Sequence, residues 1–208
     1  AVHGTAIERA AFRRATNASH AQVRSLPGEE PAYSAFDPTL QRWVGSCIYR
    51  GFEQASEAVW GLLGPDHDAF YAEGVVFGAM LQMPVDDWPA HRAAFDTYWD
   101  DGLARASIDD ATRAYLMSVV RMEYLPRRIP GWLAQRRIWL TTGFLPEALR
   151  DQMHLRWTLA DQARFDRMVT RLASAIRRSP EPVRAFPFNR SIRRVRSQLA
   201  SGDPLFDL

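Results

Sequence analysis

The sequence predicts an all-α protein, a single-domain bundle of about eight to ten helices with globin-like packing. Apolar residues recur at three- and four-residue spacing along most of the chain, whereas alternating β-branched runs bounded by hairpin turns are scarce. The 12 glycines and 13 prolines are scattered and form no linker long enough to divide the chain. We therefore expect one helical domain over residues 1–208.

Breaker and cap residues define the expected helices. Asp37-Pro38 places a capping carboxylate before a proline in the first helical turn, and Gly64-Pro65-Asp66 breaks the chain and caps the next helix. Leu26-Pro27-Gly28 ends the first helix. The expected helices cover about 5–24, 38–63, 66–81, 95–103, 110–120, 132–140, a short segment after 147, 159–178 and 190–200.

Composition excludes several classes of protein. The net charge of +2 argues against a nucleic-acid partner, and all 26 basic residues are arginines, so no lysine can act as base or metal ligand. The only cysteine, Cys47, excludes an internal disulfide, and we expect it to be a buried structural thiol. No apolar run approaches the ~20 residues of a membrane span. Cytoplasmic location is the default expectation, although the chain opens at Ala1 without methionine and an N-terminal segment is expected to precede it.

Charged clusters have ordinary structural interpretations. Adjacent residues on a helix point about 100° apart, so neighbouring aspartates do not readily share a site, and we expect them at helix ends. Arginines near the C-terminus could receive carboxylates, but a solvated helix face is the favoured interpretation. The residues concerned are Asp86-Asp87, Asp100-Asp101, Asp109-Asp110, Arg190, Arg193, Arg194 and Arg196.

Among the five histidines, His20 is the strongest candidate for chemistry. The sequence holds no metal-binding histidine pair, nucleophile elbow, phosphate-binding loop or dinucleotide fingerprint. On a helix, His20 falls at the edge of the face that carries Phe12, Thr16 and Val23. Such a histidine can be a proximal ligand of haem iron, but spacing alone favours a core histidine satisfied by hydrogen bonds.

Several separated motifs occur in a specific order. His20 to Val23 reads H-x-x-V, Tyr33 to Pro38 reads Y-x-A-x-D-P, and Leu40 to Val44 reads L-x-x-W-V. Phe144-Leu145-Pro146, Leu149-Arg150, Trp157 and a P-x-x-V-R-x-x-P segment at Pro180 to Pro187 follow. In this order the chain resembles the family of bacterial latex clearing protein and the fungal oxygenase MpaB, from about Gly4 to Arg196.

The resemblance implies an all-helical haem b protein that uses dioxygen to cleave a carbon–carbon double bond in an apolar, isoprenoid-like small molecule. It also implies that His20 is the proximal iron ligand, which moves the balance for this residue toward the haem interpretation. The chain departs from the family in its missing lysine and in Gly45, where many relatives carry histidine. It also begins too late to show the arginine–threonine helix that the family carries before the H-x-x-V segment. A haem-free relative that binds a ligand or partner therefore remains the alternative.

Overall fold

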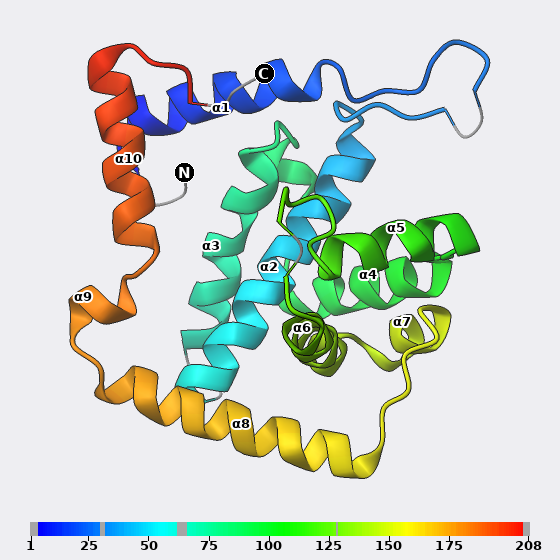
Figure 1. Cartoon of the computed structure of the whole chain (residues 1–208). Coiled ribbons are helices and arrows are strands. Elements are labelled where there is room, and N and C mark those ends of the chain that lie inside the picture. Colours follow the sequence, from blue (N-terminus) through cyan, green and yellow to red (C-terminus); the bar gives the residue numbers. More distant parts are fainter. Residues whose placement is uncertain (1–3, 30–31, 62–65, 128, 206–208) are drawn as a thin grey trace. The chain divides into compact units, whose positions relative to one another are not determined.

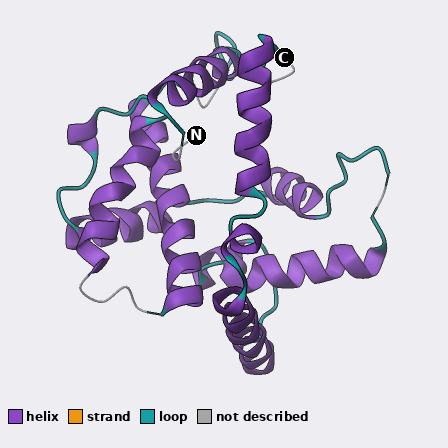
Figure 2. Cartoon of the chain, turned by 90° about the vertical axis from the view of Figure 1, so that its left-hand side faces the viewer, coloured by secondary structure: helices purple, strands orange, loops and turns teal. Residues whose placement is uncertain are grey.

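Figure 1 presents the computed structural model of the chain, which describes residues 4–29, 32–61, 66–127 and 129–205. Over these residues the secondary structure consists of helices and loops with one isolated β-bridge, and Figure 2 shows no strand among them. The all-α prediction is confirmed. The helices are α1 (Ala6–His20), α2 (Pro38–Trp60), α3 (His67–Ala79), the 3₁₀ helix η2 (Val85–Asp87), α4 (Arg92–Arg105), α5 (Asp110–Val120), α6 (Gly131–Phe144), α7 (Glu147–Gln152), α8 (Leu159–Arg178), α9 (Glu181–Arg184) and α10 (Phe188–Ser201).

The chain divides into two compact units, each of which is described by itself. The first unit comprises Ala1–Thr97 and Ser174–Leu208, and the second comprises Tyr98–Ala173. The chain passes from one unit to the other within α4 and again within α8. One domain over residues 1–208 remains a prediction.

Side-chain caps explain where several helices begin. Thr5 and Glu8 form a capping box at α1, in which the Thr5 amide donates to Glu8 Oε2 at 2.7 Å. Asp37 caps α2 as predicted, since its carboxylate accepts from the Thr39 amide at 2.7 Å and Pro38 occupies the first turn. Asp109 caps α5 in the same way through the Thr112 amide.

Two expectations about helix caps are wrong. Asp66 precedes α3 but makes no side-chain cap hydrogen bond, while Gly64 and Pro65 lie outside the described residues. Asp100 and Asp101 lie inside α4, exposed to solvent, and not at its terminus. Their carboxylates therefore cap nothing.

Helix α1 ends at His20, four residues before the expected end at Arg24. The following segment pairs with a stretch that precedes α2: the Ala35 amide donates to Val23 O at 2.9 Å, and the Ser25 amide donates to Tyr33 O at 3.0 Å. Backbone groups that bond across this bridge cannot continue the helical ladder. A contact between distant residues thus overrides the local helical pattern.

Helices α2 and α3 pack closely through glycines. A methyl group added at Gly45 would lie 2.8 Å from Cα of Gly78, and one at Gly74 would lie 2.5 Å from the ring of Tyr49. These positions require residues without a side chain because backbone and ring atoms already occupy the space. In Figure 1 the two helices run side by side through the first unit.

An aromatic core lies beside this helix pair. Tyr49 is completely buried, and its ring centroid lies 4.9 Å from that of Phe95, 5.5 Å from Tyr71 and 5.9 Å from Trp88, each in an edge-to-face arrangement. The Tyr71 hydroxyl donates to the Pro89 carbonyl oxygen at 2.6 Å. Burial raises the pKa of Tyr71 to about 12, so this hydroxyl stays a donor.

The second unit has an aromatic core of its own around Phe165 of α8. This ring lies 4.9 Å from Phe144, 5.8 Å from Trp139 and 5.9 Å from Trp157, all measured between centroids. The Phe165 ring also lies directly against Gly143 of α6, where a larger residue would collide with it. Helix α8 therefore packs against α6 through the buried side chain of Phe165.

No helix within the described ranges is long and apolar enough to cross a membrane.

The glycine contact leads to a prediction that compares two residues of α2. Gly45→Ala forces a methyl group against the α3 backbone and should lower the free energy of unfolding by about 1–3 kcal/mol. Gly51→Ala is the control, since nothing lies within 4 Å of its added methyl group. It should raise stability by about 0.5–1 kcal/mol through helix propensity. Urea unfolding followed by circular dichroism measures the free energy of unfolding of both variants. Equal changes of the same sign in the two variants would contradict the close packing at Gly45.

Candidate functional site

His20 is the last residue of α1, and its side chain is partly buried. Within the part of the chain that the structure describes, its imidazole makes no hydrogen bond and no ion pair. A core histidine satisfied by hydrogen bonds, which spacing alone favoured, would show such a partner. Neither ring nitrogen of His20 is thus bonded to another of the described residues.

The last turn of α1 is anchored near the first half of α2. Asn17, one turn before His20, accepts a hydrogen bond from the side-chain amide of Gln82, which follows the end of α3. This end of α3 carries Gly78, the residue that packs against Gly45 in α2. His20 is thus held at the end of the α2–α3 pair where α2 begins.

A stripe of apolar side chains on α2 remains partly exposed. Its members repeat every four residues and therefore share one helix face, with exposed fractions between 38 and 46%. They are Leu40, Val44, Ile48 and Phe52. Val23, Leu26 and Phe36, in the segment between α1 and α2, are also exposed. Contiguous exposed apolar surface is the kind of surface at which proteins bind apolar ligands or partners.

Cys47 also lies exposed on α2. The expectation of a buried structural thiol is wrong. The buried face of α2 is formed by other residues of the helix, Ser46 and Tyr49 among them. The apolar pattern of α2 continues around most of the helix, and sequence alone does not tell which part of it is covered.

A buried ionic cluster around Glu53 was missed by the sequence analysis. The Glu53 side chain is 1% exposed and accepts a hydrogen bond from the Tyr49 hydroxyl at 2.8 Å. Arg50 Nη1 lies 2.6 Å from Glu53 Oε2, and His67 Nε2 lies 3.1 Å from Glu53 Oε1. Arg92 of α4 also pairs with Glu53 and contacts His67. The cluster therefore ties α2 to both α3 and α4.

The electrostatics of this cluster keep Glu53 ionised. Burial opposes its charge, but hydrogen bonds from Tyr49, His67 and Arg50 and the positive charge of Arg92 outweigh burial and lower the pKa of this carboxyl. Burial and the neighbouring Glu53 raise the pKa of Tyr49, which remains a neutral donor. A carboxylate whose oxygens are occupied by four donors is a poor proton acceptor, and we assign the cluster a structural role.

One signal in the sequence could have revealed the cluster. Gln41, Gly45, Tyr49 and Glu53 follow one another at four-residue spacing, and all four are buried. A glutamate in the same row as a tyrosine and a glycine indicates a buried charge, which requires a partner. The partners Arg92 and His67 lie 39 and 14 residues further along the chain and are brought to it only by the fold.

The C-terminal arginines form a solvated face of α10, as favoured above. Arg190, Arg193, Arg194 and Arg196 are all exposed. Arg196 Nε lies 2.7 Å from Glu8 Oε1 and so joins α10 to α1. Arg193 donates to the Asn189 carbonyl oxygen on its own helix. Two of these arginines thus stabilise α10 itself and its contact with α1.

Fold and site together define an all-α protein over the described residues, in which His20 has no hydrogen-bond partner among those residues and lies at the end of a helix pair that carries exposed apolar surface. The sequence model of one family, the catalytic domain of ER-bound oxygenase mpaB/B' and rubber oxygenase, matches residues 1–177, and the chain belongs to this family. The match ends before Pro180, so the P-x-x-V-R-x-x-P segment and the expected extension to Arg196 lie outside it.

Two curated relatives, both uncharacterized proteins, come from Mycobacterium bovis and Mycobacterium tuberculosis. Each is 38% identical to this chain over 178 residues, which is 85% of this chain and 70% of the relative. No solved structure matches the chain significantly. The family is thus established by sequence.

The Glu53 cluster leads to a prediction of pH-dependent stability. The pKa of Glu53 is lowered by folding from an ordinary value of 4.5, so its ionised form stabilises the protein above that value. This stabilisation is lost as the pH falls through the lower value of the folded state. Glu53→Gln leaves Arg50 and Arg92 without their buried partner and should cost about 3 kcal/mol at neutral pH.

Urea unfolding at pH 7 and at several acidic values measures this effect. The difference in stability between the wild type and Glu53→Gln should shrink as the pH is lowered below 4.5. Glu57→Gln, one helical turn further along α2, removes the same charge where no ion pair is present among the described residues, and it should be nearly neutral. A large cost for both variants, or a difference independent of pH, would disprove a specific role for Glu53.

Proposed function

We propose that the protein is a haem b-dependent oxygenase that uses dioxygen to oxidise an apolar, isoprenoid-like small molecule, with His20 as the proximal iron ligand. Membership of the oxygenase family supports the reaction class. The observation that carries the proposal is the imidazole of His20, which has no hydrogen-bond partner among the described residues and lies where apolar side chains are exposed.

The residues present fit this cofactor in their chemistry. A proximal ligand must offer an imidazole nitrogen, and neither nitrogen of His20 is bonded to another of the described residues. A porphyrin is flat and largely apolar, and the exposed stripe of α2 with Val23 and Phe36 provides apolar surface of matching character. Bound haem would supply the iron that activates dioxygen.

The side chains of this chain would then have two tasks. His20 would hold the iron, and the hydrogen bond between Asn17 and Gln82 anchors the last turn of α1, which carries His20. The apolar residues of α2 exclude water and hold an apolar substrate by burial of its surface. Such a surface selects for hydrocarbon character and size.

A haem-free relative that binds an apolar ligand or partner is the second candidate. Gly45 packs against Gly78 at a position where many members of the family carry histidine, and the chain has no lysine. Whatever chemistry those groups support in relatives is not available from the same positions here. Exposed apolar surface on α2 suits this alternative equally well.

Haem binding tests the proposal directly. Full-length protein expressed with a haem supply should show a Soret band, and His20→Ala should lose most of it because the iron loses its proximal ligand. Added imidazole should restore part of the band in His20→Ala. His154→Asn is the control, since asparagine tolerates the backbone φ of 54° found at His154 and should leave the spectrum unchanged.

Retention of the full Soret band in His20→Ala would refute the ligand assignment. A wild-type protein that stays colourless with haem supplied, and that consumes no oxygen with apolar substrates, would establish the haem-free alternative.

A further inference from the structure

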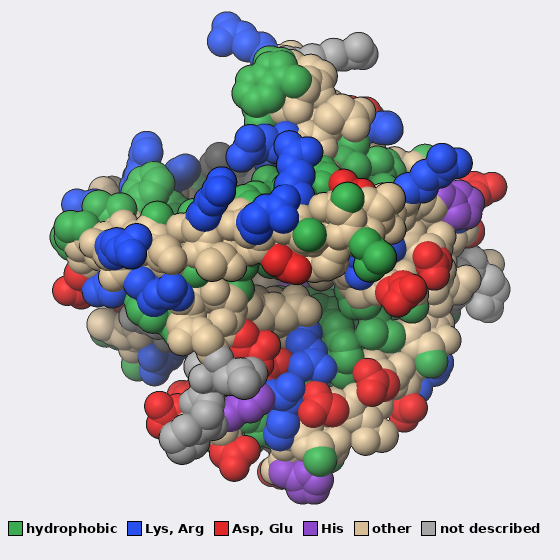
Figure 3. Space-filling view, turned by 90° about the horizontal axis from the view of Figure 1, so that it is seen from below, with side chains coloured by type: hydrophobic (Ala, Val, Ile, Leu, Met, Phe, Trp, Pro, Cys, Tyr) green, Lys and Arg blue, Asp and Glu red, His purple; other side chains and the backbone are tan. Residues whose placement is uncertain are grey.

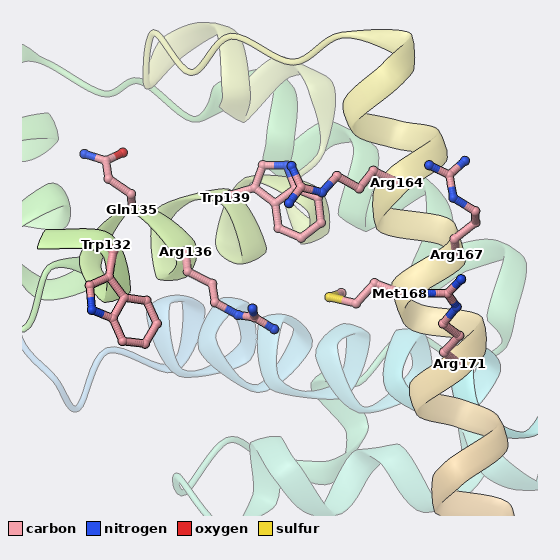
Figure 4. Close-up of a pocket in the computed structure, with 8 residues that line it drawn as sticks. All are labelled: Trp132, Gln135, Arg136, Trp139, Arg164, Arg167, Met168 and Arg171. Atoms are coloured by element: carbon pink, nitrogen blue, oxygen red, sulfur yellow. The ribbon is translucent and has the colours of Figure 1, made fainter. Parts of the chain in front are cut away.

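An open groove lies between α6 and α8, entirely within the second unit, and has a volume of about 760 Å³. Figure 4 shows its lining residues: Arg136 of α6 and Met168 of α8 point toward one another across the groove, and Trp139 lies beside Arg164. The complete lining is Trp132, Gln135, Arg136, Trp139, Arg164, Arg167, Met168 and Arg171.

The lining residues form two facing stripes. On α6, Trp132, Arg136 and Trp139 are separated by four and three residues and therefore share one face of the helix. On α8, Arg164, Arg167, Met168 and Arg171 follow the same spacing. Both helices thus present alternating cationic and apolar side chains to one space.

The groove carries an uncompensated positive charge. It is lined by four arginines and by no carboxylate, and α6 contains no acidic residue. Arg136, Arg167 and Arg171 make no hydrogen bond or ion pair with other residues in the described ranges, in contrast to Arg50, Arg92 and Arg113. Figure 3 shows basic side chains gathered over α8 on the face seen there.

The acidic residues of α8 are occupied elsewhere. Asp161 accepts hydrogen bonds from Thr158 and, at 3.4 Å, from Trp139 Nε1, while Asp166 accepts from Gln162 at 2.8 Å. Guanidinium groups held close together without a counter-charge repel one another, and a bound anion would relieve this repulsion. The charge pattern selects for an anion that presents planar or branched oxygens to several guanidinium groups.

The remaining lining of the groove is apolar. Trp132 is 69% exposed, and the thioether of Met168 projects into the same space. Trp139 packs against Phe165 and Trp157. The guanidinium carbon of Arg164 lies 5.3 Å from the centroid of the Trp139 ring, in a cation–π contact. A ligand here can bury hydrocarbon against indole and thioether groups while its charged end meets arginine.

We propose that the groove between α6 and α8 binds a small amphiphilic organic anion, a carboxylate or phosphate monoester attached to an apolar body. The volume lies within the range of about 300–1,000 Å³ that is typical of small-molecule sites. The alternation of cationic and apolar groups within one groove favours a molecule with both characters over a bare anion or a neutral hydrocarbon. Neither His20 nor haem takes part, so the site is independent of the proposed oxygenase chemistry.

Isothermal titration with octyl phosphate, used below the concentration at which it aggregates, tests the proposal on the full chain. Octanol and inorganic phosphate, titrated separately, represent the apolar body and the anion alone. Octyl phosphate should bind more tightly than either, and Arg136→Gln/Arg167→Gln/Arg171→Gln should weaken its binding roughly tenfold or more. Glutamine has nearly the helix propensity of arginine, so the helices should be retained, which circular dichroism checks.

A triple variant with the same charge change, Arg105→Gln/Arg127→Gln/Arg156→Gln, is the matched control. These arginines lie in the second unit, outside the groove, and form no ion pair among the described residues. The control should bind octyl phosphate within about twofold of wild type because distant exposed charges are screened by salt. Trp132→Ala should weaken the binding of octyl phosphate and leave the binding of inorganic phosphate unchanged.

Three outcomes would overturn the proposal. If both triple variants weakened octyl phosphate binding equally, the effect would come from the overall charge of the protein and not from the groove. Inorganic phosphate that binds as tightly as octyl phosphate would show an anion site without an apolar part. Binding to vesicles of anionic phospholipid, without binding of monomeric octyl phosphate, would show that the arginines serve a lipid surface.

Discussion

The contact between Gly45 and Gly78 fixes the orientation of α2, and most features of the first unit follow from it. A helix that packs backbone to backbone on its neighbour cannot rotate about its axis without collision. The orientation that places Gly45 on α3 also directs Tyr49 and Glu53 inward. It leaves the neighbouring face of α2, which begins at Leu40, partly open to solvent. One contact therefore determines both the buried ion cluster and the exposed apolar stripe.

The same contact leaves no room for a larger side chain at position 45, where the resemblance to the family implies a histidine in many relatives. A histidine in place of Gly45 would need space that the α3 backbone occupies here, so α2 and α3 would have to move apart. In the proposed function, polar groups must therefore come from other parts of the chain, such as His20.

Local sequence signals predicted the helices well where they act alone. The amphipathic pattern of α8 gave its limits as Leu159–Arg178, and Asp37-Pro38 gave the start of α2. The end of α1 was misplaced because Val23 and Ser25 pair with residues before α2. Helix α9 was missed because its four residues are too few for a periodic pattern. The sequence therefore predicts elements but not the contacts that shorten them.

The site was predicted less completely than the fold. His20 could be selected from sequence as a lone histidine at the edge of a helix face, and its lack of a hydrogen-bond partner became visible only in the structure. The Glu53 cluster joins residues from α2, α3 and α4, and no local pattern connects Glu53 to Arg92. Likewise, the stripes of α6 and α8 are each readable in sequence, but only the fold sets them opposite one another.

The exclusive use of arginine gives the two charged regions of this protein different responses to acid. Guanidinium groups keep their protons under all conditions in which proteins are folded. The cationic walls of the groove therefore hold their full charge when the medium becomes acidic, whereas the carboxylate of Glu53 gradually loses its own. Below pH 4.5 the positive charge of the groove in the second unit would therefore persist, while the ion cluster of the first unit would weaken as Glu53 is protonated.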